Sequence, residues 1–404
     1  MKIAMEMKGA EASQFYIDDL VAPLIAFRRD LHAHPELAFA EHRTAALIAE
    51  ALRQAGLDVH TGIGGTGLVA VLKVGSSGRS IGLRADMDAL PMHEQTNLDY
   101  ASGNPGVFHG CGHDGHVAML LGAAQHLARS RRFDGTVHFI FQPAEEGRGG
   151  ARAMVADRLF ERFPCDRVFA LHNWPDLPAG TVATRPGPIM AAADRFEILL
   201  EGRGGHAAMP HQTPDAILAA SDLVTQLNCI VSRRVPPTAS AVLSVTQIEG
   251  GNSHNVLPAA VRIVGTVRSF DPAVQDRIEA SLRQIVDGIA QASGTRATVT
   301  YDRYYPAAIN DAEAAAEALA AAATVTCVQN APEPAFTSED FAFMLLACKG
   351  AYLWLGQGRG DGDAPLHHPN YDFNDGILAT GIRLHTALVE RYLCSEALPD
   401  VIGR

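Results

Sequence analysis

The densest group of chemically active side chains lies in residues 109–116, HGCGHDGH. Cys111 and His113 are two positions apart on an extended or turning backbone, so both side chains can reach one point, and the glycines permit a close approach. A thiolate and an imidazole suit Zn²⁺ or a related divalent ion. For this segment alone, a glycine-rich loop with incidental histidines is the alternative interpretation.

Further acidic and histidine side chains follow three predicted strands. They are Asp86 and Asp88 after residues 80–84, Glu145 and Glu146 after residues 136–142, and His172 after residues 167–171. In an open parallel sheet, ligands bind at the carboxyl ends of the strands. Each residue alone would be read as a solvated or capping group, but their joint placement indicates one site.

The adjacent glutamates predict a division of work. The side chains of Glu145 and Glu146 diverge, so one can bind metal while the other faces the substrate. Two cations about 3.5–4 Å apart lower the pKa of a bridging water and give a hydroxide nucleophile at neutral pH. A free carboxylate beside that water can take its proton and deliver it to a departing amine. The pattern predicts metal-dependent hydrolysis of an amide.

The bulk properties restrict the class of protein. A chain of 404 residues, 47% hydrophobic and 19% charged, predicts two domains. The net charge of −12 and the absence of clustered Lys and Arg argue against a nucleic-acid partner and favour a small molecule. Residues 1–13 do not read as a secretory signal, and the longest apolar run, residues 341–348, is too short for a membrane span.

The cysteines lack paired spacing, which suits a reducing cytoplasm better than a disulfide framework. They are Cys111, Cys165, Cys229, Cys327, Cys348 and Cys394. All except Cys111 have apolar neighbours, so we expect five small buried hydrophobes. We therefore predict a cytoplasmic protein that does not bind a membrane.

The N-terminal and C-terminal parts of the chain have patterns that predict alternating helices and strands. Helices are expected in residues 18–55 (two, with a stop at Gly56), 116–130 and 150–161, and strands in residues 67–74, 80–84, 136–142 and 167–171. Towards the C-terminus we expect helices 312–323, 338–349 and 377–392 and strand 351–355. This alternation predicts an α/β fold with a mostly parallel sheet covered by helices on both faces.

The middle of the chain has a different order. Strands are expected at residues 194–200, 240–248, 260–268 and 295–301, and helices at 214–231 and 273–292. This β-α-β-β-α-β order predicts a ferredoxin-like unit. Proline-rich segments, RPGPIM and YYPAAIND, flank it. We therefore expect an inserted lid and dimerisation domain, residues 190–305, and a discontinuous metal-binding catalytic domain, residues 1–189 and 306–404.

Six segments in this order and spacing resemble the peptidase family M20, in its aminoacylase-like branch: RADMDALP, HGCGHDGH, FQPAEEG, LHNWP, GRGGHAAMPH and HHPNYDFND. That branch includes hippurate hydrolases, indole-acetyl-amino-acid hydrolases and N-acetyl-amino-acid deacetylases. The resemblance covers nearly the whole chain. It implies hydrolysis of N-acyl amino acids to a carboxylic acid and an amino acid, with two divalent ions per subunit (Zn, Mn, Co or Ni).

The resemblance also implies roles for individual residues. The metal ligands would be Cys111, His113, Glu146, His172 and His367. Glu145 would be the general base and acid, which takes a proton from the metal-bound water to give hydroxide, and Asp88 would orient the site. Many other M20 members have His-x-Asp where this chain has Asp86 and Asp88. The roles of Asp86, His116 and His368 stay open.

Three lid residues, His206, Asn255 and Arg268, resemble positions that contact the substrate. In relatives the histidine commonly reaches the partner subunit's site and stabilises the oxyanion, which implies a homodimer or higher homo-oligomer. A surface histidine and an exposed strand-end arginine are the alternatives for His206 and Arg268. The opening segment RRDLHAHPELAFAE, from Arg28, also resembles the start of the family, and we assign it a structural role.

Two other functions fit parts of the sequence. Cys111 could be a thiol nucleophile with His113 or His116 as its base, although residues so close in sequence rarely form that geometry. The chain could also be an inactive, metal-dependent binding protein. The Glu145 and Glu146 pair and the complete set of ligands argue against this second alternative.

Overall fold

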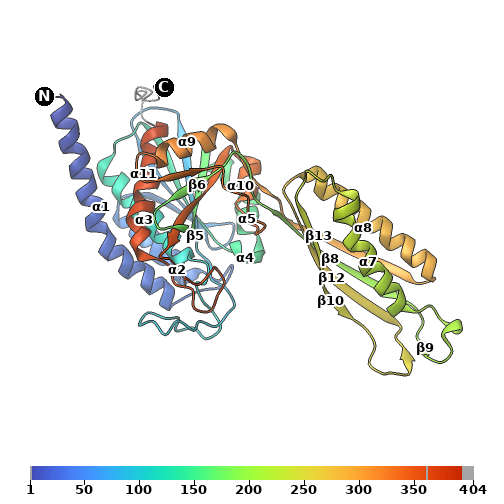
Figure 1. Cartoon of the computed structure of the whole chain (residues 1–404). Coiled ribbons are helices and arrows are strands. Elements are labelled where there is room, and N and C mark those ends of the chain that lie inside the picture. Colours follow the sequence, from blue (N-terminus) through green and yellow to red (C-terminus); the bar gives the residue numbers. More distant parts are fainter. Residues whose placement is uncertain (1, 361–362, 394–404) are drawn as a thin grey trace. The chain divides into compact units, whose positions relative to one another are not determined.

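The computed structural model describes residues 2–360 and 363–393 and divides the chain into two compact units (Figure 1). The large unit comprises Met1–Ile189, Ile309–Glu333 and Asp340–Arg404. The small unit comprises Met190–Ala308 and Pro334–Glu339. Each unit has its own apolar core. The two segments of the small unit are therefore inserted between the three segments of the large unit.

The large unit contains an eight-stranded mixed sheet in the order β1-β2-β4-β3-β5-β16-β6-β15. The strands are β1 Asp58–Ile63, β2 Gly67–Val74, β3 Ser80–Asp86, β4 Gly135–Gln142, β5 Arg167–Pro178, β6 Val182–Thr184, β15 Val328–Asn330 and β16 Gly350–Gly358. The central strands β4, β3, β5 and β16 are parallel, and every residue of β3 is buried, as expected for a strand covered on both faces. The predicted α/β sheet is confirmed.

Helices cover both faces of this sheet (Figure 1). They are α1 Lys2–Ala33, α2 His42–Gln54, α3 His113–Ser130, α4 Glu145–Arg148, α5 Gly150–Ala156, α6 Leu159–Arg162, α9 Ala312–Ala322, α10 Ala342–Ala347 and α11 Leu378–Leu393, with a 3₁₀ turn, η2 Asp375–Ile377. Helices α3 and α11 pack on each other and against β3, and α1 packs on both helices. On the opposite face, α5 packs against β4 and α10 against α5.

The small unit is an antiparallel four-stranded sheet, β10-β12-β8-β13, with two helices packed on it. Its elements are β8 Ala192–Glu201, α7 Ala216–Arg234, β10 Ala241–Glu249, β12 Ala260–Ser269, α8 Pro272–Ser293 and β13 Arg296–Tyr305. Its short elements are β9 Gly205–His206, η1 Pro210–Gln212 and β11 Val256–Leu257. The short strands β7 Gly187–Met190 and β14 Ala308–Asn310 pair with each other and lie mostly in the large unit. The β-α-β-β-α-β order and this strand order match the predicted ferredoxin-like fold.

Two predicted helices differ from the structure. The helix expected over residues 150–161 is broken between α5 and α6, where Arg158 has a φ of 62° and the Asp157 carboxylate accepts the N–H of Gly64 at 3.0 Å. The helix expected over residues 338–349 is reduced to α10. The Asp340 carboxylate instead accepts bonds from Gln142, 2.7 Å, and from the N–H of Ala151, 2.9 Å. Tertiary hydrogen bonds override local helix propensity at both places.

The expectation of five buried cysteines outside the site was wrong in part. Cys348 is buried and Cys165 is half-buried, but Cys229 and Cys327 are exposed. These four thiols and Cys111 are free, and Cys394 lies outside the described residues. Apolar neighbours in sequence do not determine burial, because adjacent residues of a helix or strand point in different directions.

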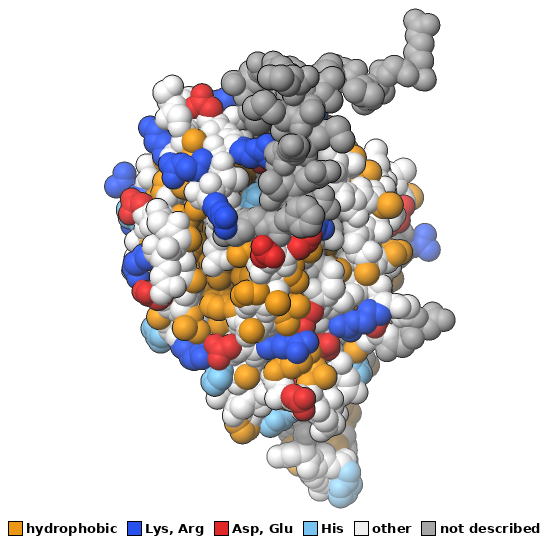
Figure 2. Space-filling model, turned by 90° about the vertical axis from the view of Figure 1, so that its left-hand side faces the viewer, with side chains coloured by type: hydrophobic (Ala, Val, Ile, Leu, Met, Phe, Trp, Pro, Cys, Tyr) orange, Lys and Arg blue, Asp and Glu red, His pale blue; other side chains and the backbone are white. Residues whose placement is uncertain are grey.

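No helix in the described part of the chain is long and apolar enough to cross a membrane. Figure 2 shows one face of the molecule, on which hydrophobic side chains gather near the middle. Lys, Arg, Asp and Glu are interspersed around them. Among the described side chains visible on this face, charges of the two signs are therefore mixed.

The close packing of α3 predicts a contrast between two helical glycines. A Cβ on Gly115 would lie 2.2 Å from the Phe373 ring, whereas a Cβ on Gly288 in α8 would meet nothing within 4 Å. We expect Gly115→Ala to lower the free energy of unfolding by about 1–3 kcal/mol, because the added methyl group would overpack the core. Gly288→Ala should raise it by up to about 1 kcal/mol, since alanine has the better helix propensity. Urea unfolding followed by circular dichroism measures both, and equal effects would contradict this packing.

Candidate metal centre

The structure brings together the five residues expected to bind metal. Cys111, His113 and Glu146 each offer a donor atom within 4.8 Å of the others. The His367 Nε2 atom lies 3.1 Å from the Glu146 carboxylate, and the Cys111 Sγ atom lies 3.5 Å from His172 Nε2. Cys111, His113 and His172 are buried, whereas the His367 side chain is 51% exposed. The cluster is therefore enclosed on one side and open at His367.

A tight turn gives this cluster its first two side chains. Gly112 has a φ of 90°, and a Cβ there would lie 2.4 Å from Asn173 Oδ1, so this position requires glycine. His113 is the first residue of α3. The backbone between Cys111 and His113 thus turns into a helix, which is the second of the two conformations that the sequence allowed.

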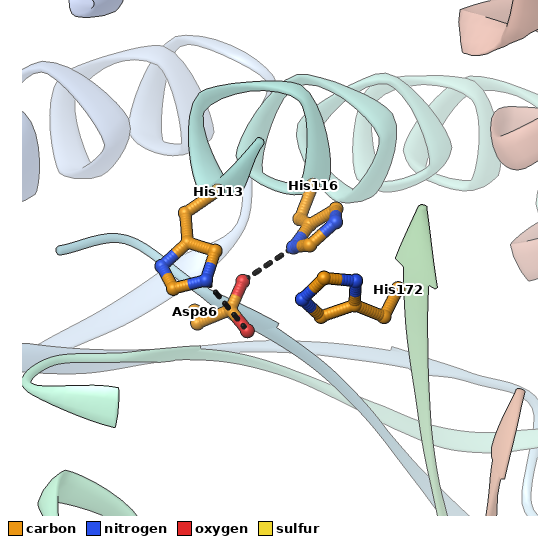
Figure 3. A group of neighbouring side chains, drawn as sticks. All are labelled: Asp86, His113, His116 and His172. Atoms are coloured by element: carbon orange, nitrogen blue, oxygen red, sulfur yellow. Dashed lines mark hydrogen bonds and ion pairs between the residues drawn. The ribbon is translucent and has the colours of Figure 1, made fainter. Parts of the chain in front are cut away.

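A second, overlapping group consists of Asp86, His113, His116 and His172, whose donor atoms lie within 4.8 Å of one another (Figure 3). His113 and His116 project from the same side of α3 toward Asp86 at the end of β3. The Asp86 carboxylate is 2.5 Å from His116 Nδ1 and 3.7 Å from His113 Nε2. The His116 and His172 ring centroids are 4.5 Å apart. Asp86 and His116 therefore fix the packing around the imidazoles of the cluster.

His172 does not follow its strand, as the sequence suggested, but lies inside β5. This strand continues to Pro178 because it pairs with β16, including the register pair Trp354 and His172. The pairing of β5 with β3 ends at Ala170 opposite Arg84. Two residues further along both strands, His172 comes level with Asp86. The side chain therefore reaches the site although the strand does not end there.

The tautomers of two imidazoles fit metal binding. His113 Nδ1 lies 2.9 Å from the Asp88 carbonyl oxygen, and His172 Nδ1 lies 2.7 Å from the Asn173 carbonyl oxygen. An N–H at each Nδ1 atom leaves the lone pair of Nε2 available to bind a cation. His113 Nε2 is buried and has no hydrogen-bond partner among the described residues. A cation would satisfy this atom, so the residues present fit a metal.

Electrostatics within the cluster are strong. Burial alone would raise the pKa of Asp86, but Arg84, His113 and His116 hold it well below its usual range. Burial and the neighbouring His116 lower the pKa of His172 well below its ordinary value. Hydrogen bonds to Cys111 and Glu146 raise the pKa of His367 to about 10. The open edge of the cluster therefore favours a positive charge.

Asp88 holds the turn that carries the two glutamates. Its carboxylate oxygens accept the N–H groups of Glu145 and Glu146, each at 3.0 Å. The Glu145 carboxylate is buried and accepts the N–H of Asp340 at 3.3 Å, whereas Glu146 points toward His367. The adjacent glutamates thus face different partners.

The polar residues beneath the cluster were not identified from the sequence. His116 Nε2 lies 2.6 Å from Asn173 Oδ1, and the Asn173 amide lies 2.7 Å from the Tyr371 hydroxyl. Gln357 Oε1 accepts from both Asn173 and Tyr371. Asn173 and Tyr371 lie within the quoted segments LHNWP and HHPNYDFND, but no local signal marks Gln357.

The three predicted substrate-contacting residues lie in the small unit. His206 is exposed in β9 and accepts the Ala208 N–H at 3.1 Å. Asn255 is exposed, and Arg268 is half-buried in β12, where it donates to the Thr266 hydroxyl and the Val267 carbonyl. His368 is exposed in the large unit.

Comparisons with known proteins agree on one family. The model of the peptidase family M20/M25/M40 matches residues 82–391. A hippurate hydrolase of Campylobacter jejuni is 41% identical over 93% of this chain and 98% of its own length. An N-acetyl-L-cysteine deacetylase of Bacillus subtilis is 39% identical over 90% and 87%. The Bacillus subtilis YXEP protein, described as a dinuclear metal binding peptidase from the M20 family, superposes with a TM-score of 0.82 at 34% identity, covering 93% and 99%.

Arg84, which is buried beneath the cluster, gives a prediction about stability. Its guanidinium donates to Asp86 at 2.8 Å and to Asp340 at 3.3 Å. We expect Arg84→Met to lower the free energy of unfolding by about 3–5 kcal/mol, because buried carboxylates lose their cation. The control is Arg195→Met, since Arg195 is 56% exposed and solvent screens its pair with Glu197, so its loss should hardly change the stability. Chemical denaturation compares the variants, and a small loss for Arg84→Met would contradict the electrostatic role.

Proposed function

Since the chain belongs to the peptidase family M20/M25/M40 and is a metal-dependent amidohydrolase, we propose that its substrates are N-acyl amino acids. Hydrolysis of their amide bond gives a carboxylic acid and an amino acid. The names of the two relatives indicate different acyl groups on an amino acid, benzoyl in hippurate and acetyl in the other substrate. The observation that carries the proposal is the convergence of five donor side chains beside a buried glutamate.

Two divalent cations are proposed to bind to Cys111, His113, Glu146, His172 and His367. The donors are a thiolate, a carboxylate and three imidazoles, a mixed set that accommodates Zn, Mn, Co or Ni. Cations bound there polarise the scissile carbonyl and lower the pKa of a water molecule. The carbonyl oxygens of Asp88 and Asn173 keep the Nε2 atoms of His113 and His172 available for this role.

Glu145 is the proposed general base and acid. Its carboxylate takes a proton from the attacking water and delivers the proton to the departing amine. Burial and the fixed backbone around Glu145 support this assignment, because a proton-transfer group must stay within hydrogen-bonding reach of the reacting atoms. Glu146, which lies beside His367, is left to bind metal.

Residues 190–305 are proposed to form a lid and dimerisation domain. In the lid, His206 stabilises the oxyanion, and Asn255 and Arg268 contact the substrate, whose carboxylate suits a guanidinium. The strand order supports pairing of two lids, because β10 is an edge strand and exposes Val242 and Ile248. The proposed assembly is a homodimer or a higher homo-oligomer.

Metal removal separates this mechanism from one with Cys111 as nucleophile. We expect a chelator to abolish hydrolysis of hippurate and other N-acyl amino acids, and Mn²⁺, Co²⁺, Ni²⁺ or Zn²⁺ to restore it. Amino acid release measures the reaction. A thiol hydrolase would keep its activity without metal and lose it on alkylation, so full activity of the chelated protein would refute the proposal.

Substitution of the base tests the role of Glu145. Glu145→Gln keeps the shape of the side chain but cannot accept the proton, so we expect kcat to fall about 10²–10⁴-fold. Bound metal, measured by mass spectrometry, should not change. Glu161→Gln, at an exposed glutamate of α6, is the control and should retain kcat. Full activity of Glu145→Gln would show that another group takes the proton.

A further inference from the structure

Glu41 is a buried carboxylate for which neither the metal centre nor the proposed mechanism gives a role. It ends the opening segment RRDLHAHPELAFAE and has an exposed fraction of 0%. One carboxylate oxygen accepts the N–H of Ala144 at 2.9 Å, and the other accepts the Thr66 hydroxyl. Ala144 directly precedes Glu145, so this buried charge contacts the turn that carries the proposed base.

The carboxylate of Glu41 does not serve its own helix. Glu41 occupies the N-cap position of α2, but its side chain makes no capping hydrogen bond there. The side chain of Glu36 takes that role, accepting the N–H groups of Arg43 at 3.0 Å and Thr44 at 2.8 Å. Stabilisation of α2 therefore does not explain where the Glu41 carboxylate points.

The turn held by Glu41 has an unfavourable backbone. Ala144 has φ 54° and ψ 42°, a left-handed conformation in which the Cβ of a residue other than glycine crowds the backbone. The Ala144 carbonyl accepts the N–H of Gly150 at 2.9 Å, and Gly150 is so close that a Cβ there would lie 1.6 Å from the Pro143 oxygen. Such a conformation persists only where the surroundings determine it.

Two buried carboxylates hold three consecutive N–H groups in this turn. Glu41 accepts the N–H of Ala144, and Asp88 accepts those of Glu145 and Glu146. The bonds to Asp88 fix the two glutamates directly. The bond to Glu41 fixes Ala144, the residue at which the chain changes direction after β4. It thereby determines the position of the Glu145 backbone, from which the side chain extends.

We propose that Glu41 is a positioning residue for Glu145: by accepting the Ala144 N–H, it maintains the left-handed turn that aims the Glu145 carboxylate. This inference rests on the proposed role of Glu145 as base. Glu41 itself has no contact with the five proposed metal ligands among the hydrogen bonds of the described residues. The proposed effect of Glu41 is therefore on the placement of Glu145 and not through direct contact with a metal ligand.

The test compares Glu41→Leu with Glu41→Gln in the metal-loaded protein, with hippurate as substrate. Leucine leaves the Ala144 N–H unpaired, and we expect kcat to fall about 100-fold, the size of effect that a misplacement of about 1 Å causes. KM and bound metal should not change. Glutamine retains an acceptor oxygen for the same N–H, so it should restore kcat to within about fivefold of the parent protein.

Glu36→Leu is the matched control, because Glu36 lies in the same segment and also accepts backbone N–H groups. It should lower the thermal midpoint and retain kcat. Thr66→Val removes the second hydrogen bond to Glu41 and leaves the bond to the Ala144 backbone in place. If Glu41→Leu does not fold, this variant tests whether Glu41 positions Glu145. We expect it to reduce kcat about threefold to tenfold, the size expected for loss of one hydrogen bond.

Combination with Glu145→Gln distinguishes the two proposals. If Glu41 acts through Glu145, adding Glu41→Leu to Glu145→Gln should reduce kcat by less than about threefold further, because residues that act as a unit are not additive. Independent effects would multiply and would overturn the inference. Full kcat in Thr66→Val and Glu41→Leu, or an equal loss in Glu36→Leu, would also overturn it. Full activity of Glu145→Gln would instead refute the proposed base.

Discussion

The buried guanidinium of Arg84 is the interaction on which the rest of the site depends. It lies in β3, where every residue is buried, and it donates to Gln142 of β4, to Asp86 and to Asp340. One cation thereby compensates the burial of two carboxylates. Asp86 then orients His116, and the Asp340 carboxylate accepts the N–H of Ala151 at the start of α5. The imidazoles and the glutamate turn are thus fixed to one network.

Local sequence patterns correctly predicted those secondary-structure elements that interactions between neighbouring residues determine. The central strands, the helices that cover them and the β-α-β-β-α-β order of the small unit follow from hydrophobic periodicity and breakers. The short edge strand β1 was missed, and the helices around Arg158 and Asp340 were predicted too long. The partners of Asp340 explain the second difference: Gln142 is 198 positions away, and no window of sequence contains both residues.

In the candidate site, too, contacts between residues distant in sequence could not be predicted. The donor residues could be identified because they form short motifs, but their supports could not. Gln357 and Glu41 contact the site from strands and loops distant in sequence, and neither residue type is unusual at its position. The groups that orient the imidazoles are even harder to identify from the sequence, because main-chain carbonyl oxygens orient His113 and His172. Any residue type supplies such an oxygen.

The irregular turn after β4 explains how two adjacent glutamates serve one site. A regular helix would have a φ of about −63° and a ψ of about −42° at each residue of this turn. Instead Ala144 is left-handed, Glu146 has a ψ of 82°, and Gly147 has a φ of 72°. These conformations turn one carboxylate toward the N–H of Asp340 and the other toward His367. Because the backbone does not favour this shape by itself, the buried oxygens of Glu41 and Asp88 must maintain it. The division between metal binding and proton transfer is therefore a property of the turn as much as of the two side chains.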